Sequence, residues 1–147
     1  MIKTYLDANI LIAGFRGDQP GSLSALSILG DPNRIFVASH YLRLETLRKP
    51  LFYRREDEVA FMEAYFAAVS HWVPTDDNLV AKALKLAAAL DLGAMDALHG
   101  VCALQGGAEE FITLERSSKS ICRIPGLRVV SLHPEAMTGW VLGDSVR

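Results

Sequence analysis

The chain has 147 residues, of which 50% are hydrophobic and 22% are charged, and its formal net charge is −2. This length and composition fit a single globular domain spanning residues 1–147, and they exclude a disordered, collagen-like or coiled-coil chain. The small negative charge excludes a globally basic protein, so any binding of a polyanion must depend on local patches of Lys and Arg.

The predicted elements follow one another as short β-like runs and helices. In chain order they are a β-like run over Ile2 to Ile12 broken by Asp7-Ala8-Asn9, a helix over Ser22 to Leu29, a strand over Ile35 to Ala38, a helix over His40 to Lys49, a helix over Glu56 to Val69, a strand over His71 to Val73, a helix from Thr75 to about Leu90, a helix over Ala94 to Gln105, and strands over Phe111 to Leu114 and Val129 to Leu132. Short apolar strands separated by helices are typical of a parallel sheet covered on both faces. In such sheets ligands bind beyond the carboxyl ends of the strands.

Several of these boundaries rest on caps and breakers. Ser39 is expected to cap the helix that follows it, and Pro50 is expected to end that helix. Thr75 is the expected cap of a later helix, with Asp76 and Asp77 stabilised at its positive end. The segment after Pro134 is expected to be a surface appendage.

The compartment is predicted from what the chain lacks. No apolar run approaches the ~18 residues that a membrane span requires, and the N-terminus does not have the pattern of a signal peptide. Cys102 and Cys122 alone do not make a disulfide framework. We therefore expect a cytoplasmic protein with no membrane association.

Four acidic residues stand at the ends of predicted elements. Asp7 interrupts an apolar strand, where a buried and unpaired carboxylate costs several kcal/mol, although it could instead start a turn or cap a helix. Glu45 lies beside an apolar helical stripe, although it could pair with Lys49 at the surface. Asp96 lies in the first turn of an apolar helix, where the helix dipole alone could explain it, and Glu115 follows a strand, where it could be an ordinary turn residue.

The expected sheet brings these four carboxylates to one edge. Carboxylates that gather without a cation raise one another's pKa, and hard divalent ions such as Mg²⁺ or Mn²⁺ remove that conflict. The absence of a cluster of Cys and His argues against zinc. The four histidines have no ligand-like spacing and are expected to be caps, packing residues or surface residues: His40, His71, His99 and His133.

Two groups of basic residues lie close in sequence to Glu45 and Glu115. They hold nine of the fifteen Lys and Arg residues, and they comprise Arg43, Arg48, Lys49, Arg54 and Arg55 in the first group and Arg116, Lys119, Arg123 and Arg128 in the second. Each residue alone could be ordinary solvated surface. Together they favour a rim that binds phosphates around the acidic pocket.

These residues, in this order, resemble the PIN domain family, and within it the VapC ribonuclease toxins of toxin–antitoxin pairs. The resemblance spans residues 2–132. It is carried by Tyr5-Leu6-Asp7-Ala8-Asn9-Ile10-Leu11-Ile12, by Glu45, by Met95-Asp96-Ala97-Leu98, by Phe111-Ile112-Thr113-Leu114-Glu115 and by Ile124-Pro125-Gly126-Leu127-Arg128-Val129-Val130.

The resemblance implies a three-layer α/β/α fold with a central parallel sheet in the order 3-2-1-4-5. It also implies a Mg²⁺- or Mn²⁺-dependent endoribonuclease with Asp7, Glu45 and Asp96 as metal ligands and Asn9 and Thr113 as supporting residues. The last acid of the family is usually Asp, whereas this chain has Glu115. That departure leaves a second interpretation open, a PIN-fold binding or regulatory module with weak or no catalysis.

The resemblance further implies partners. These are an RNA substrate, a small antitoxin protein, and a second copy of the chain in a homodimer. From the clustering of basic residues, we expect the RNA to be contacted by Arg43, Arg48, Lys49, Arg116 and Lys119.

Overall fold

The structure, a computed structural model, describes residues 1–134. The segment after Pro134, expected to be a surface appendage, lies outside these residues. The described elements are β1 (Ile2–Leu6), α1 (Ala8–Arg16), α2 (Ser22–Leu29), β2 (Arg34–Ala38), α3 (His40–Phe52), α4 (Glu56–Ala68), β3 (His71–Trp72), α5 (Asp77–Leu90), α6 (Ala94–Gln105), β4 (Glu110–Thr113), the 3₁₀ helix η1 (Ser120–Arg123) and β5 (Val129–Ser131).

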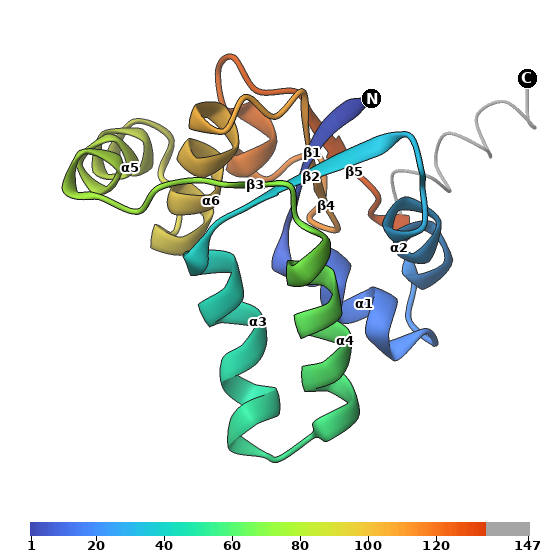
Figure 1. Ribbon diagram of the computed structural model, residues 1–147. Coiled ribbons are helices and arrows are strands. Elements are labelled where there is room, and N and C mark those ends of the chain that lie inside the picture. The colour runs from blue at the N-terminus through green and yellow to red at the C-terminus, as the bar shows by residue number, and fades with distance from the viewer. Residues whose placement is uncertain (135–147) are drawn as a thin grey trace, which may run out of the picture.

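Five parallel strands form the central sheet in the order β3-β2-β1-β4-β5, as the sequence analysis predicts (Figure 1). In the register, Tyr5 of β1 lies between Val37 of β2 and Phe111 of β4. All three side chains are fully buried. Burial of both faces explains why the carboxyl-terminal halves of β1 and β2 are apolar at consecutive positions rather than at alternating ones.

Helices cover the two faces of the sheet (Figure 1). On one face, the end of α6 packs closely on the sheet, since a Cβ added to Gly106, the residue that caps this helix, would lie 2.5 Å from a methyl group of Val37 in β2. Helix α5 lies outside α6. On the other face α1, α2 and α4 pack together, with Gly14 of α1 against Leu29 of α2 and Phe61 of α4. The expected three-layer α/β/α architecture is therefore confirmed.

The first helix replaces the second half of a run expected to be β-like, and it confirms the alternative that Asp7 caps a helix. The apolar run over Ile2 to Ile12 is a strand only as far as Leu6, and Ile10 to Ile12 belong to α1. The change from strand to helix occurs at Asp7. Its backbone is still extended, and its side chain accepts the N–H of Ala8 and so caps α1. Ile10 and Leu11 are fully buried, and an apolar run buried on all sides has no period that separates helix from strand.

Two other boundaries differ from the sequence prediction. Pro50 does not end α3, because its ring fits helical φ and the backbone hydrogen bonds resume after it, from Tyr53 N–H to the carbonyl of Lys49 at 2.9 Å. Asp76, and not Thr75, caps α5, since its carboxylate accepts the N–H of Leu79 at 2.8 Å. The remaining expected boundaries agree with the structure to within one residue.

Within residues 1–134, no single helix combines the length and the apolar composition that crossing a membrane requires. Taken together, α5 and α6 would meet both criteria, but the two helices are bent by 118° at the break between them.

Candidate active site

Asp7 lies at the carboxyl edge of the sheet, at the junction of β1 and α1. Its two carboxylate oxygens are both used, because Oδ1 accepts the N–H of Ala8 and Oδ2 accepts the hydroxyl of Thr113, each at 2.8 Å. Burial raises the pKa of Asp7 to about 6, and the negative charge of Asp96 acts in the same direction. The charge of His99 and the hydrogen bonds from Thr113 and Ala8 lower the pKa of Asp7. A buried carboxylate kept beside a second acid is an arrangement that a cation stabilises.

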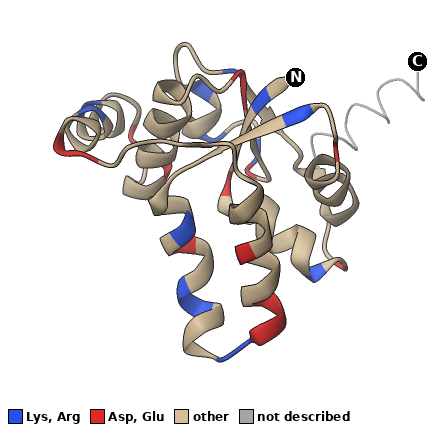
Figure 2. Ribbon diagram, viewed as in Figure 1, with Lys and Arg blue, Asp and Glu red and all other residues tan. Residues whose placement is uncertain are grey.

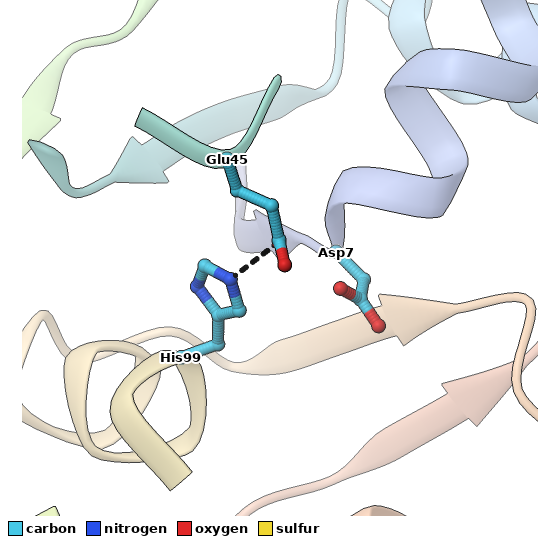
Figure 3. Close-up of side chains that lie close together, drawn as sticks. All are labelled: Asp7, Glu45 and His99. Carbon is cyan, nitrogen blue, oxygen red and sulfur yellow. Dashed lines mark hydrogen bonds and ion pairs between the residues drawn. The ribbon is translucent and has the colours of Figure 1, made fainter. Parts of the chain in front are cut away.

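Glu45 reaches the same place from α3, and His99 reaches it from α6 (Figure 3). His99 is completely buried, and its Nε2 lies 2.9 Å from Oε1 of Glu45. One ligand atom from each of Asp7, Glu45 and His99 lies within 4.8 Å of the other two. The surface pair of Glu45 with Lys49 that the sequence allowed is not formed; the carboxylate turns inward instead.

Asp96 and Glu115 belong to the same electrostatic environment. Burial raises the pKa of Asp96, the charges of Glu115 and Glu45 raise it further, and those of His99 and Lys119 lower it. Asp96 lies in the first turn of α6, and Glu115 follows β4. The structure therefore brings all four acids of the sequence analysis to one edge of the sheet, with two of them at raised pKa.

The donor set fits a divalent cation. It consists of carboxylate oxygens, the ligands that Mg²⁺ and Mn²⁺ prefer, and a single imidazole nitrogen lies beside them. Burial and neighbouring acids raise the pKa of Asp7 and of Asp96, so a positive charge beside them would favour their ionised forms. A cation bound among Asp7, Glu45 and Asp96 would supply the missing positive charge.

Asn9 and Thr113 join the first helix to the end of β4. The hydroxyl of Thr113 donates to Asp7 and accepts both the N–H of Glu115 at 3.0 Å and the side-chain amide of Asn9 at 3.3 Å. The side-chain oxygen of Asn9 accepts the N–H of Leu114 at 3.1 Å. Both side chains thus fix Asp7 and the backbone before Glu115 in place.

The basic residues are arranged less uniformly than the acids. Arg43 forms an exposed ion pair with Glu63 of α4, with 2.7 Å between Nη2 and Oε1. Arg48 and Lys49 are exposed farther along α3, and Figure 2 shows basic positions on α3 opposite acidic ones on α4. Lys119 is close enough to lower the pKa of Asp96, and Arg116 is exposed in the same loop. Lys119 of the second basic group is therefore near the acidic cluster, whereas Arg43 is engaged by α4.

His99 is the site residue that the sequence analysis missed. We expected the histidines to be caps, packing residues or surface residues, but His99 contacts both Glu45 and Tyr5. One local signal was available: His99 follows Asp96 by three positions, so both side chains lie on one face of the same helix. Its partner Glu45 is on another helix, and no local pattern indicates that contact.

Comparison with known proteins gives a family and a set of similar structures. The sequence profile of the family described as PIN domain matches residues 4–124. No curated protein sequence matches the chain significantly.

Three solved structures share the fold at low sequence identity. They are VapBC2 from Rickettsia felis bound to a DNA fragment from their promoter (16% identity, TM-score 0.67, covering 88% of this chain and 98% of that one), a toxin–antitoxin complex from Klebsiella pneumoniae (19%, 0.64, 88% and 97%) and VapBC-1 from nontypeable Haemophilus influenzae (20%, 0.63, 89% and 98%). At these identities the likeness shows the fold.

Proposed function

The chain belongs to the PIN domain family, and on that premise we propose that it is a Mg²⁺- or Mn²⁺-dependent endoribonuclease and the toxin of a toxin–antitoxin pair. PIN domains are generally nucleases. The observation that carries the proposal is the buried carboxylate of Asp7, with a pKa of about 6, beside Glu45 and Asp96 at the carboxyl edge of the sheet.

In the proposed reaction Asp7, Glu45 and Asp96 hold the cation. A bound divalent cation lowers the pKa of a coordinated water and offsets the charge that develops on the phosphate. Asp7 would bind the cation, and Thr113 and Ala8 hold its two oxygens in one orientation. Asp96, in the first turn of α6, and Glu45, on α3, would be the other two ligands. Glu115 acts at the margin of the pocket, through its charge on Asp96.

Substrate binding in this proposal depends on the basic residues around the pocket. An acidic centre repels RNA unless cations surround it, and Lys and Arg gain affinity by releasing counterions from phosphates. Lys119 and Arg116 border the pocket directly, and Arg48 and Lys49 extend the surface along α3. Arg43 would join them after its ion pair with Glu63 breaks. Exposed ion pairs of this kind contribute only about 0–1 kcal/mol to stability, so the cost is small.

The partners are proposed from the similar structures. Two of them are named VapBC and a third is described as a toxin–antitoxin complex. We propose a small antitoxin as the partner of this chain, a homodimer as its assembly and the cytoplasm as its compartment.

The decisive experiment is an RNA cleavage assay with the purified chain. We expect structured RNA to be cut in Mg²⁺ or Mn²⁺ and cleavage to stop in EDTA. Cleavage that continues in EDTA would contradict the proposed chemistry. Binding of RNA or of an antitoxin with no cleavage in any divalent ion would favour the alternative, a PIN-fold binding module.

Glu115 distinguishes this chain from the usual family pattern, and its effect on activity is expected to be intermediate. Glu115→Ala should reduce cleavage at low metal concentration by roughly 10–100-fold, the usual cost of losing a group beside the ligands. Glu115→Asp should preserve or raise activity there, because it restores the usual residue. The measurement is a metal titration of the cleavage rate for the wild type and both variants. Equal curves for all three would remove Glu115 from the site.

A further inference from the structure

A chain of three buried polar side chains lies behind Glu45. The hydroxyl oxygen of Tyr5 is 2.7 Å from Oγ of Ser39 on one side and 2.7 Å from Nδ1 of His99 on the other. Nε2 of His99 then lies 2.9 Å from Oε1 of Glu45. Ser39, Tyr5 and His99 are all 0% exposed, so no solvent competes for these hydrogen bonds.

The direction of the chain follows from counting donors and acceptors. Oγ of Ser39 accepts the N–H of Leu42 at 3.3 Å, so its hydroxyl hydrogen is available for Tyr5. Tyr5 then donates to Nδ1 of His99, which places the ring hydrogen on Nε2, facing Glu45. In the opposite direction the lone pair of Nε2 would face a carboxylate oxygen at 2.9 Å, and the buried ring nitrogen would be left without a donor.

The bond from His99 restrains a side chain that has little else to hold it. Glu45 is long, has three rotatable bonds and is one-third exposed, with 32% of its side chain accessible. A glutamate of this kind loses side-chain conformational entropy when it is fixed in one rotamer, so a single well-placed hydrogen bond decides where its carboxylate lies. His99 is rigid and buried on α6, the helix that also carries Asp96. One helix therefore sets the positions of two proposed ligands.

We propose that His99 is a positioning residue: fixed in one tautomer by Tyr5 and Ser39, it donates from Nε2 to one oxygen of Glu45 and leaves the other oxygen to bind the cation. This inference rests on the proposed function, since it concerns the cation of the same site. It assigns the buried imidazole a role outside the ligand set, although its nitrogen lies within 4.8 Å of carboxylate oxygens.

Two substitutions separate the hydrogen bonds of His99. The side-chain nitrogen of Gln stands at the same number of bonds from Cβ as Nε2, so His99→Gln keeps a donor toward Glu45. An Asn side chain places its terminal atoms at the position of Nδ1. His99→Asn therefore keeps the hydrogen bond with Tyr5 and loses the one with Glu45. Mn²⁺ affinity of the purified full chain, measured by calorimetry, should fall by roughly 10–100-fold in His99→Asn and stay within about threefold of the wild type in His99→Gln.

The outcomes distinguish this inference from the proposed function. Equal losses of affinity in the two variants, or no loss in either, would overturn the positioning role while wild-type binding of Mn²⁺ left the proposed function standing. A wild type that binds no Mn²⁺ would overturn both. Pulsed electron paramagnetic resonance of the Mn²⁺-loaded wild type adds a test that needs no variant to fold. We expect no coupling from a directly bound nitrogen, and such a coupling would make His99 a ligand and refute the proposal.

Discussion

Asp7→Asn is expected to abolish measurable RNA cleavage while making the metal-free protein more stable at neutral pH. Activity should fall by more than the ~10–100-fold typical of losing a group outside the ligand set, because an amide binds Mg²⁺ and Mn²⁺ far more weakly than a carboxylate. The measurements are cleavage at saturating metal and the free energy of unfolding of the metal-free proteins.

The gain in stability follows from the direction of the pKa shift. Asp7 has a pKa of about 6 in the folded chain and 3.8 as its ordinary value, so between these values the native state binds more protons than the unfolded one. Stability of the metal-free wild type should therefore decline as pH rises from about 4 to 6 and stay reduced above that window. The variant has no such loss.

The size of the gain is limited by one hydrogen bond. The full shift corresponds to about 3 kcal/mol, but an amide nitrogen facing the hydroxyl of Thr113 offsets part of it, because that hydroxyl already donates to Asp7. We expect a net gain of about 1–2 kcal/mol at pH 7.5 and none below pH 4. Saturating Mg²⁺ should raise the unfolding temperature of the wild type and leave that of Asp7→Asn unchanged.

A matched control is Asp76→Asn. Asp76 caps α5 through the same kind of hydrogen bond, at 2.8 Å to the N–H of Leu79, but its carboxylate is exposed. This variant should cleave RNA at the wild-type rate. If Asp7→Asn instead lost both activity and stability, Asp7 would be a helix cap whose loss disrupts the fold, and the metal centre would lose its main support.

Much of this fold could be predicted from the chain alone, because strands buried on both faces read as short apolar runs between helices. The gathering of Asp7 and Glu115 followed from the topology, since carboxyl ends of parallel strands meet at one edge. The strand order came from the resemblance to the PIN domain family. The first helix was missed because Ile10 and Leu11 are as buried as the strand before them.

The finer structure of the site depends on contacts that no local pattern encodes. Glu45 looked able to pair with Lys49, its neighbour on the same helix, yet it bonds to His99, 54 positions later. The raised pKa of Asp7 depends on its burial and on the nearby charge of Asp96, and both arise only in the folded chain. Sequence alone therefore predicts which acids gather at this edge of the sheet, but not the side chains that orient them.

The second large effect is expected in cells. If the chain is a ribonuclease toxin, its expression without an antitoxin should arrest growth, and Asp96→Asn should restore growth to the level of an empty vector. Asp96 is half-buried, and burial and the charges of Glu115 and Glu45 raise its pKa, so removing its charge relieves repulsion in the absence of metal. The variant should therefore accumulate normally, although it lacks the proposed ligand in the first turn of α6.

The control for this experiment is Asp91→Asn, which makes the same change of charge at an exposed residue five positions earlier. Asp91 has a positive φ of 53°, a conformation that Asn tolerates well, so this variant should fold and remain toxic. Growth is compared at equal protein abundance, measured by immunoblot. Asp96→Asn that is as abundant and as toxic as the wild type would show that toxicity does not come from the proposed metal centre. Loss of toxicity in both variants would show that the arrest responds to charge around α6 in general, and would also count against a catalytic origin.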